Sequence, residues 1–370
     1  MESTGPQILA ARLGRAQELT AAQGLDALLI TPGPDLRYLV GYDAVPLERL
    51  TCLVVPARGN AVLVAPRLEL LAAEASPVGR MGIDCEGWGE TDDPYALVAR
   101  IMGPAARVGL DNHMWAEKVL SLRAAMPGCD QVLAGTVLAE QRMRKDAAEI
   151  DALVAAGAAI DAVHAEVPGL LRAGRTEREV AADIADLILQ VGHSRVDFII
   201  VGSGPNGASP HHEVSDRVLE HGDAVVVDIG GTMPGGYRSD CTRTYAIGSA
   251  PEGFMPRYEV LQAAQAAASA YARAGVTCEA VDAAARDVLH AAGLGDLFIH
   301  RTGHGIGLET HEDPYIVSGN TRVLDAGMAF SIEPGFYVEG AYGARIEDIV
   351  IATDTGVIVA NQRPRDLIVA

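Results

Sequence analysis

The sequence has few cysteines and no cysteine pair of the C-x-x-C type. Its cysteines are odd in number and scattered along the chain: Cys52, Cys85, Cys129, Cys241 and Cys278. We therefore expect free thiols in a reducing compartment and no disulfide framework. The N-terminus lacks an apolar segment behind a basic start, and no stretch approaches the roughly 18 apolar residues that span a bilayer. These shortages predict a cytoplasmic protein without a membrane partner.

Basic residues are outnumbered by acidic ones, since 29 Lys and Arg stand against 49 Asp and Glu, which gives a formal net charge of −20. Such a charge disfavours nucleic acid and anionic membranes as partners. Apolar residues make up 49% of the chain and charged residues 21%, as is typical of a globular protein. A length of 370 residues favours two domains. Small molecules and peptides remain as candidate partners.

Two carboxylates stand in a segment, Ala224 to Tyr245, that otherwise has the pattern of a buried β-hairpin. Asp228 follows the apolar run Val225 to Val227, and Asp240 comes after a turn rich in Gly and Pro. Two buried carboxylates close together repel each other unless a cation or a proton neutralises them. The hairpin therefore predicts a metal site.

A second hairpin near the C-terminus repeats this arrangement, because the segment from Met328 to Ile351 again carries apolar strands, a Gly-rich turn and two acids, Glu333 and Glu347. Between the hairpins, a Gly-rich loop bears His304 and His311. Four carboxylates and one histidine form a ligand set for two fairly hard divalent ions, with two acids bridging the ions.

Four motifs in these segments carry a resemblance to a known family. They are D-x-G…G-Y-x-S-D from Asp228 to Asp240, G-H-G-I-G-L-E-x-H-E from Gly303 to Glu312, S-I-E-P-G-x-Y from Ser331 to Tyr337, and R-I-E-D from Arg345 to Asp348. Together and in this order they resemble the pita-bread metallopeptidases, the group of prolidase, aminopeptidase P and methionine aminopeptidase. The large N-terminal part of the chain argues against methionine aminopeptidase.

The pattern of elements predicts an α/β N-terminal domain, residues 1–136, and an α+β catalytic domain, residues 137–370. In the first domain, helices are expected over residues 7–24, 68–75, 94–102 and 114–126, and strands over residues 27–30, 51–56, 61–66, 107–110 and 131–134. In the second, helices are expected over residues 137–167, 177–191, 258–273 and 279–292, and strands over residues 198–201 and 298–300. Two helices followed by a carboxylate-bearing hairpin occur twice, which suggests pseudo-two-fold symmetry. The pita-bread fold implied by the resemblance has that form.

The resemblance also implies roles for the acids and for His304. It assigns Asp228 to one ion, His304 and Glu333 to the other, and Asp240 and Glu347 to bridging positions. Glu333 would also take a proton from the attacking hydroxide.

Outer positions of the family's site correspond to His211 and His311. The histidines would hold the scissile carbonyl and pass a proton to the leaving nitrogen, although either could be an ordinary hydrogen-bonded histidine. Arg345, two residues before Glu347, is expected on the same strand face, where it would hold the bridging carboxylates or the substrate. His212 is expected to point away from the site, and His300 is expected to have no role in it.

We therefore expect an Xaa-Pro dipeptidase that binds two divalent ions, Mn²⁺ by preference for oxygen ligands, with Co²⁺ or Zn²⁺ as alternatives. A homodimer is also expected. Aminopeptidase P, which shares the motifs, is the alternative activity; a catalytically inactive binding protein or a metal-free creatinase-like hydrolase is a different class. Several prolidases have an arginine where this chain has Tyr315, so the proline carboxylate would need another partner, such as Arg322, a residue of the N-terminal domain or a neighbouring subunit.

Overall fold

The computed structural model describes residues 5–370, in two compact units that divide between Arg142 and Met143. The division lies beyond the expected boundary at residue 136, because helix α7 (Gly135–Arg142) belongs to the first unit. Val137 and Leu138 are buried there, and Arg142 Nη1 lies 2.7 Å from Asp35 Oδ1. The expected helix over residues 137–167 is therefore two helices.

The first unit is a mixed sheet with helices packed on it. Its elements are α1 (Pro6–Ala22), β1 (Ala27–Ile30), α2 (Pro34–Val40), β2 (Cys52–Pro56), β3 (Val62–Pro66), α3 (Leu70–Ala75), α4 (Pro77–Arg80), β4 (Asp84–Trp88), α5 (Pro94–Met102), β5 (Arg107–Leu110), α6 (Ala116–Ala125), β6 (Asp130–Leu133) and α7. The strand order is β4-β3-β2-β1-β5-β6. β2 and β3 form an antiparallel hairpin, and β1 pairs in parallel with β5. The α/β class expected for this part is confirmed, with α2, α4 and β4 as additions.

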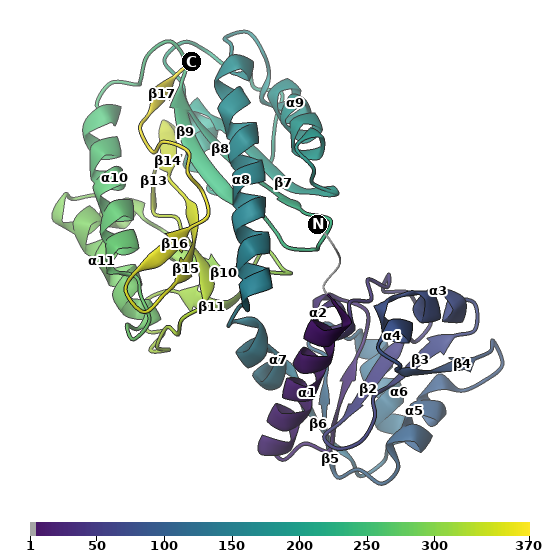
Figure 1. Cartoon of the computed structure of the whole chain (residues 1–370). Helices are drawn as coiled ribbons and strands as arrows, with labels where there is room; N and C mark the ends of the chain where they lie inside the picture. Colours follow the sequence, from purple (N-terminus) through teal and green to yellow (C-terminus); the bar gives the residue numbers. More distant parts are fainter. Residues whose placement is uncertain (1–4) are drawn as a thin grey trace. The chain divides into compact units, whose positions relative to one another are not determined.

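The second unit contains the remaining elements (Figure 1). They are α8 (Ala147–Leu170), α9 (Glu177–Gln190), β7 (Arg195–Ser203), the 3₁₀ turn η1 (Gly204–Ala208), β8 (Ala224–Thr232), β9 (Cys241–Ala246), α10 (Phe254–Tyr271), α11 (Cys278–Ala291), the 3₁₀ turn η2 (Gly295–Leu297), β10 (Gly303–Gly305), β11 (Glu312–Ile316), β12 (Ala329–Ile332), β13 (Gly335–Val338), β14 (Tyr342–Arg345), β15 (Asp348–Ala352), β16 (Val357–Val359) and β17 (Ile368–Val369). None of the helices within residues 5–370 has the length and apolar character needed to cross a membrane.

The helix starts of the second unit follow local capping chemistry. α8 begins at a capping box, in which the side chains of Asp146 and Glu149 each accept the other residue's backbone N–H. α9 begins at a second capping box, formed by Thr176 and Glu179. Thr277 caps α11, because its hydroxyl accepts from the N–H of Ala280.

Two sheets bring the acidic hairpins together. One has the order β17-β9-β8-β7, and the other has the order β11-β10-β12-β15-β16, while β13 and β14 form a separate two-stranded ribbon. Helices α8 and α9 lie to one side of these strands and α10 and α11 to the other (Figure 1). An apolar core containing Ile160, Ile184 and Val227 joins α8 and α9 to the first sheet.

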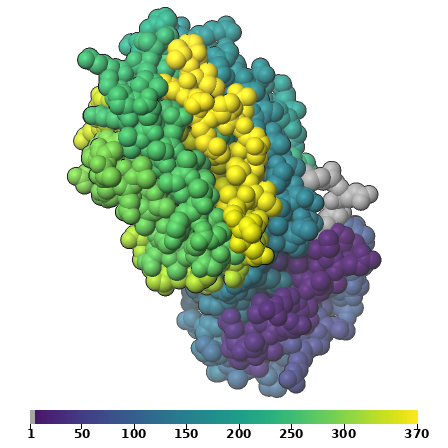
Figure 2. Space-filling view, turned by 60° about the vertical axis from the view of Figure 1, so that its left-hand side comes forward, coloured from purple at the N-terminus to yellow at the C-terminus, as the bar shows by residue number. Residues whose placement is uncertain are grey.

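The last residues of the chain lie along the surface between α8 and α10 (Figure 2). Tyr258 of α10 donates its hydroxyl to the Arg365 carbonyl at 2.9 Å, and Asp161 of α8 accepts from the N–H of Gln362. The C-terminal segment thus contacts both α8 and α10.

Residues 298–300, expected as a strand, form no strand; the nearest one is β10. Two backbone carbonyls that a neighbouring strand would bind in a sheet instead accept hydrogen bonds from a side chain. Arg286 of α11 donates to the carbonyls of Phe298 at 3.2 Å and His300 at 2.9 Å. This segment is therefore irregular, and it turns the His300 side chain toward Tyr337, whose hydroxyl lies 2.8 Å from Nε2.

Candidate metal centre

Every residue predicted for the site lines one cavity of about 860 Å³ in the second unit. These residues are Asp228, Asp240, Glu333, Glu347, His304, His211, His311 and Arg345. They come from both acidic hairpins and from the loops beside them. The structure therefore brings together residues that are far apart in the sequence, as the motifs predicted.

Strand pairing places the first two acids on the same face. Asp228 of β8 is opposite Thr242 of β9, and Asp240 lies two residues before Thr242. Because side chains two residues apart in a strand point the same way, Asp228 and Asp240 are diagonal neighbours. Both are buried, with 8% and 3% of their surfaces exposed.

The second pair of acids lies where the β12–β15 ladder ends. Ile332 pairs with Asp348, so Glu333 and Glu347 occupy the next opposed positions. The hydroxyl of Ser331 donates to Glu333 Oε1 at 2.8 Å, and that of Thr242 donates to Glu347 Oε2 at 2.7 Å. The two hairpins therefore meet through their side chains.

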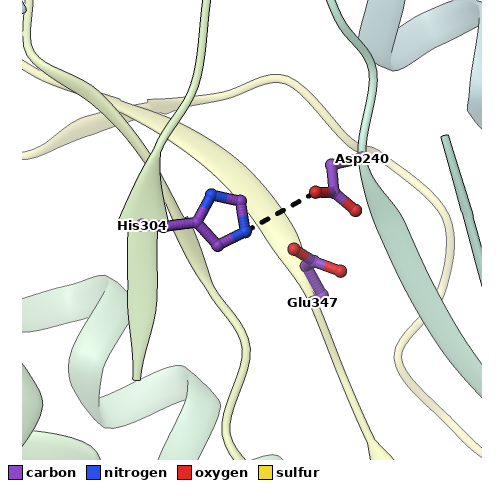
Figure 3. Close-up of side chains that lie close together, drawn as sticks. All are labelled: Asp240, His304 and Glu347. Carbon is purple, nitrogen blue, oxygen red and sulfur yellow. Dashed lines mark ion pairs between the residues drawn. The ribbon is translucent and has the colours of Figure 1, made fainter. Parts of the chain in front are cut away.

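His304 faces this group of acids from strand β10. Its Nε2 lies 3.2 Å from Glu333 Oε1 and 3.6 Å from Asp240 Oδ2. Ligand atoms of Asp240, His304 and Glu347 all lie within 4.8 Å of one another, and the three side chains point toward one another (Figure 3). The arrangement is a convergent set of oxygen and nitrogen donors.

Electrostatics in this cluster favour a cation. Burial raises the pKa of Asp240 well above its ordinary value, and the charge of Asp228 raises it further. Burial and the charge of Asp240 do the same to the pKa of Glu347. Burial would also raise the pKa of Glu333, but the hydrogen bond and charge of His304 lower it to about 2. The charge of His304 therefore offsets only part of the repulsion between the buried carboxylates.

Two buried carboxylate oxygens indicate whether the side chains of this cluster suit a metal ion. Within residues 5–370, Asp228 Oδ1 and Glu347 Oε1 are buried and have no hydrogen-bond partner. A buried, unpartnered carboxylate oxygen is unfavourable, whereas a divalent cation would satisfy it and offset the repulsion. The donor set, mainly carboxylate oxygen with one imidazole, suits ions such as Mn²⁺ or Zn²⁺. The residues present fit a metal.

Arg345 contacts a different acid from those expected. Its Nη2 lies 2.5 Å from Asp228 Oδ2, and its Nη1 donates to the Tyr337 hydroxyl at 2.7 Å. It does not share a strand face with Glu347, because β14 ends at Arg345 and β15 begins at Asp348. Arg345 therefore orients Asp228, leaving the oxygen Oδ1 of that residue available.

The two outer histidines lie beside the cluster. The rings of His311 and His304 are edge to face, with centroids 4.2 Å apart. Although the His311 side chain reaches solvent, partial burial and the charge of His304 lower its pKa to about 4, so it is neutral at neutral pH. His211 is exposed and lines the same cavity.

Among the residues that line the cavity without having been predicted for the site are two histidines and an arginine. His212 was expected to point away, but residues 211–214 form no strand, so strand alternation does not apply there. His300, for which no role was expected, also lines the cavity, and burial lowers its pKa to about 4. Arg301 lines it too, with its guanidinium 4.4 Å from the centroid of the Tyr315 ring. Arg322, proposed as a substitute cation, is not among the residues that line the cavity.

Models of two protein families match the chain. The model of metallopeptidase family M24 matches residues 151–354, which include the whole carboxylate cluster. The model of the creatinase/prolidase N-terminal domain matches residues 12–144. The matched segments agree closely with the two units of the structure.

Similar proteins extend over almost the whole chain. The probable dipeptidase PepE of Mycobacterium tuberculosis is 55% identical over 364 residues, covering 98% of this chain and 97% of that protein. The Xaa-Pro dipeptidase of Lactobacillus helveticus is 35% identical over 366 residues, covering 96% of this chain and 98% of that protein. The crystal structure of the dipeptidase PepE from Mycobacterium ulcerans has a TM-score of 0.95 at 54% identity, covering 100% of this chain and 99% of that one.

Proposed function

The chain belongs to metallopeptidase family M24 and is a metal-dependent peptidase, and from this premise we propose that it is an Xaa-Pro dipeptidase with two divalent ions. The observation that carries the proposal is the meeting of four carboxylates and His304 in one cavity, with two buried carboxylate oxygens left without a partner. The names of the similar dipeptidases support the substrate class.

In this proposal Asp228, Asp240, His304, Glu333 and Glu347 hold the ions. When bound, the ions would activate water as the nucleophile and polarise the scissile carbonyl. Mn²⁺ is the preferred ion because the ligands are mainly oxygen, with Co²⁺ and Zn²⁺ as alternatives.

In this proposal Glu333 accepts the proton of the attacking water. Its lowered pKa, about 2, keeps it ionised at neutral pH, and its hydrogen bond from Ser331 holds the carboxylate in the cavity. An ionised carboxylate can act as a base while also binding an ion.

We assign to His311 a role at the scissile carbonyl and the leaving group. Because its pKa is about 4, the imidazole is neutral and can donate one N–H to the scissile carbonyl or to the prolyl nitrogen. His211, which lines the same cavity, would donate a second hydrogen bond to the substrate.

Arg301 gives the cavity a positive group that suits a short substrate. A dipeptide carries a carboxylate only one residue beyond the scissile bond, whereas a longer peptide carries an amide there. The Arg301 guanidinium lies over Tyr315, the residue that replaces the arginine of several prolidases. We assign to Arg301 the role of binding the proline carboxylate, since a guanidinium recognises a carboxylate with strong, paired hydrogen bonds.

The test compares hydrolysis of Gly-Pro, Ala-Pro and Ala-Pro-Ala by protein saturated with Mn²⁺. A dipeptidase hydrolyses the two dipeptides at least about tenfold faster than the tripeptide, the factor equivalent to about 1.4 kcal/mol. Faster hydrolysis of Ala-Pro-Ala would instead identify an Xaa-Pro aminopeptidase. No hydrolysis of any of the three by metal-loaded protein would favour a binding protein.

A further inference from the structure

Glu177, the first residue of α9, is a buried acid outside the carboxylate cluster, with 0% of its surface exposed. Its Oε1 accepts from the N–H of Ser203 at 2.8 Å and from the Ser203 hydroxyl at 2.6 Å. Its Oε2 accepts from the N–H of Ser215 at 3.1 Å and from the Ser215 hydroxyl at 2.7 Å. One carboxylate therefore binds two serines, Ser203 and Ser215, through both their backbone N–H groups and their hydroxyls.

These two serines flank a single loop, residues 204–214, which includes η1 and His211. Glu177 also binds the loop between its ends. Asn206 Nδ2 lies 3.0 Å from Oε1, and His212 Nε2 lies 2.7 Å from Oε2. The loop is thus attached to the start of α9 at both ends and at two positions within it.

The loop is held from the opposite side by the acidic hairpins. Both terminal nitrogens of Arg345 donate to the Pro210 carbonyl at 3.3 Å, directly before His211. Gly343 lies so close to the loop that an added Cβ would stand 1.9 Å from the Gly207 carbonyl oxygen. Because Arg345 also holds Asp228, the loop and a proposed metal ligand share one partner.

The charge of Glu177 strengthens these contacts. Burial would raise its pKa, but the hydrogen bonds from Ser203, Ser215 and His212 lower it to about 2. The carboxylate is therefore ionised at neutral pH, and hydrogen bonds to an ionised acceptor are about twice as strong as neutral ones.

We propose that Glu177 is a positioning residue for peptide hydrolysis, because its contacts fix the 204–214 loop so that His211 faces the metal ligands. This inference rests on the proposed function, in which His211 acts on the scissile carbonyl. Glu177 lines no part of the cavity and acts only through the loop.

The first experiment compares Glu177→Gln with Asp161→Asn. An amide cannot accept hydrogen bonds at both of its ends, so Glu177→Gln loses part of its hold on the loop. Asp161 is a matched control, since it is also a buried acid of this unit and accepts from Asn361 and Gln362, which do not line the cavity. We expect Glu177→Gln to lower kcat about tenfold or more at full metal occupancy, because small displacements of a catalytic group are costly. Asp161→Asn should lower thermal stability without lowering kcat.

A double-mutant cycle with His211→Ala separates positioning from a general structural role. If Glu177 acts through His211, Glu177→Gln has little further effect on kcat once His211 is gone. If the two fold-changes multiply, Glu177 acts independently of His211 and the inference is wrong. Should Glu177→Gln fail to fold, Ser215→Ala replaces it in the same cycle, because this change removes one hydroxyl donor and keeps the carboxylate.

Amide hydrogen exchange makes the inference testable apart from the proposed function. The amides of residues 204–214 should exchange faster in Glu177→Gln or Ser215→Ala than in the wild type. In Asp161→Asn their exchange rates should equal those of the wild type. Unchanged exchange in this loop contradicts the inference even if the wild type hydrolyses Ala-Pro. Conversely, a wild type that hydrolyses no Xaa-Pro peptide contradicts the proposed function, while faster exchange would still support the hold of Glu177 on the loop.

Discussion

At the scale of single residues, Asp240 and Glu347 are the acids whose pKa values are raised well above the ordinary range, in both cases by burial first and then by a neighbouring carboxylate, Asp228 for Asp240 and Asp240 for Glu347. Removing one charge should weaken ion binding while relieving repulsion in the metal-free protein. We predict that Asp240→Asn and Glu347→Gln each abolish turnover, while the metal-free variants melt at or slightly above the wild-type temperature. Kinetics at saturating Mn²⁺ and thermal melts in chelator measure both effects. A wild-type rate in either variant would rule out the bridging role.

His311 contributes through proton transfer and hydrogen bonding in this account, not through metal binding. Because such a group is typically worth about 10²- to 10⁴-fold, His311→Ala should lower kcat by that factor with unchanged metal content. A variant that loses metal would identify a ligand, and one that loses only thermal stability would identify a core histidine. Measuring kcat, metal content and melting temperature on one preparation distinguishes these roles.

Arg301 should act on substrate binding more than on chemistry. A hydrogen bond to a charged group contributes about 1.5–3 kcal/mol, so Arg301→Met should raise KM for Ala-Pro by about 10- to 100-fold. Hydrolysis of Ala-Pro amide, which lacks the carboxylate, should change little. An equal loss for both substrates would show that Arg301 does not bind the carboxylate.

At the scale of elements, His164 connects helix α8 to strand β9. Its Nε2 lies 3.0 Å from the Cys241 carbonyl and its Nδ1 lies 2.9 Å from the Tyr245 hydroxyl, an arrangement that suits a neutral ring. Burial and the charge of Arg243 lower its pKa to about 3. The packing of α8 on the sheet therefore depends on an uncharged histidine.

This connection predicts a pH effect on stability. Below a pH of about 6.5 the unfolded chain binds a proton at His164 that the folded protein does not bind until about pH 3. Stability should therefore fall as the pH falls, by up to about 1.4 kcal/mol per pH unit from this residue. Denaturant unfolding between pH 7 and pH 4 should show a steeper loss for the wild type than for His164→Gln. Equal slopes would mean that His164 titrates in the folded protein.

The elements that carry the acids could be predicted because a carboxylate is anomalous in an apolar strand. Asp228 lies at such a position and Glu347 lies directly before strand β15, and the hairpin pairing follows from local turns. The break between α7 and α8 was missed, although the pair Asp146 and Glu149 has the spacing of a capping box and could have indicated it.

Other parts of the site could not be predicted, because their conformation depends on contacts with residues far away in the sequence. The strand expected at residues 298–300 does not form, because Arg286 binds its carbonyls from another element. His212 lies in an irregular loop, where a strand's alternation gives no guide to direction. Its orientation depends on Glu177, which lies on a different helix.

At the scale of the whole molecule, both families' models and both compact units agree on an N-terminal creatinase/prolidase domain followed by a pita-bread catalytic domain. The catalytic unit repeats two helices and an acidic hairpin, and the two hairpins supply all four carboxylates of one site. Such a site is completed only when both halves of this unit have folded. We therefore attribute metal binding to the folded catalytic unit and not to any single motif.

The central claim is that this site holds two catalytic ions. The most direct measurement is a titration of metal-free protein with Mn²⁺, in which elemental analysis of bound metal and Ala-Pro hydrolysis are followed on the same samples. The account predicts no activity without metal, and two ions bound per chain when the activity reaches its maximum. A fully active protein with at most one tightly bound ion would contradict it.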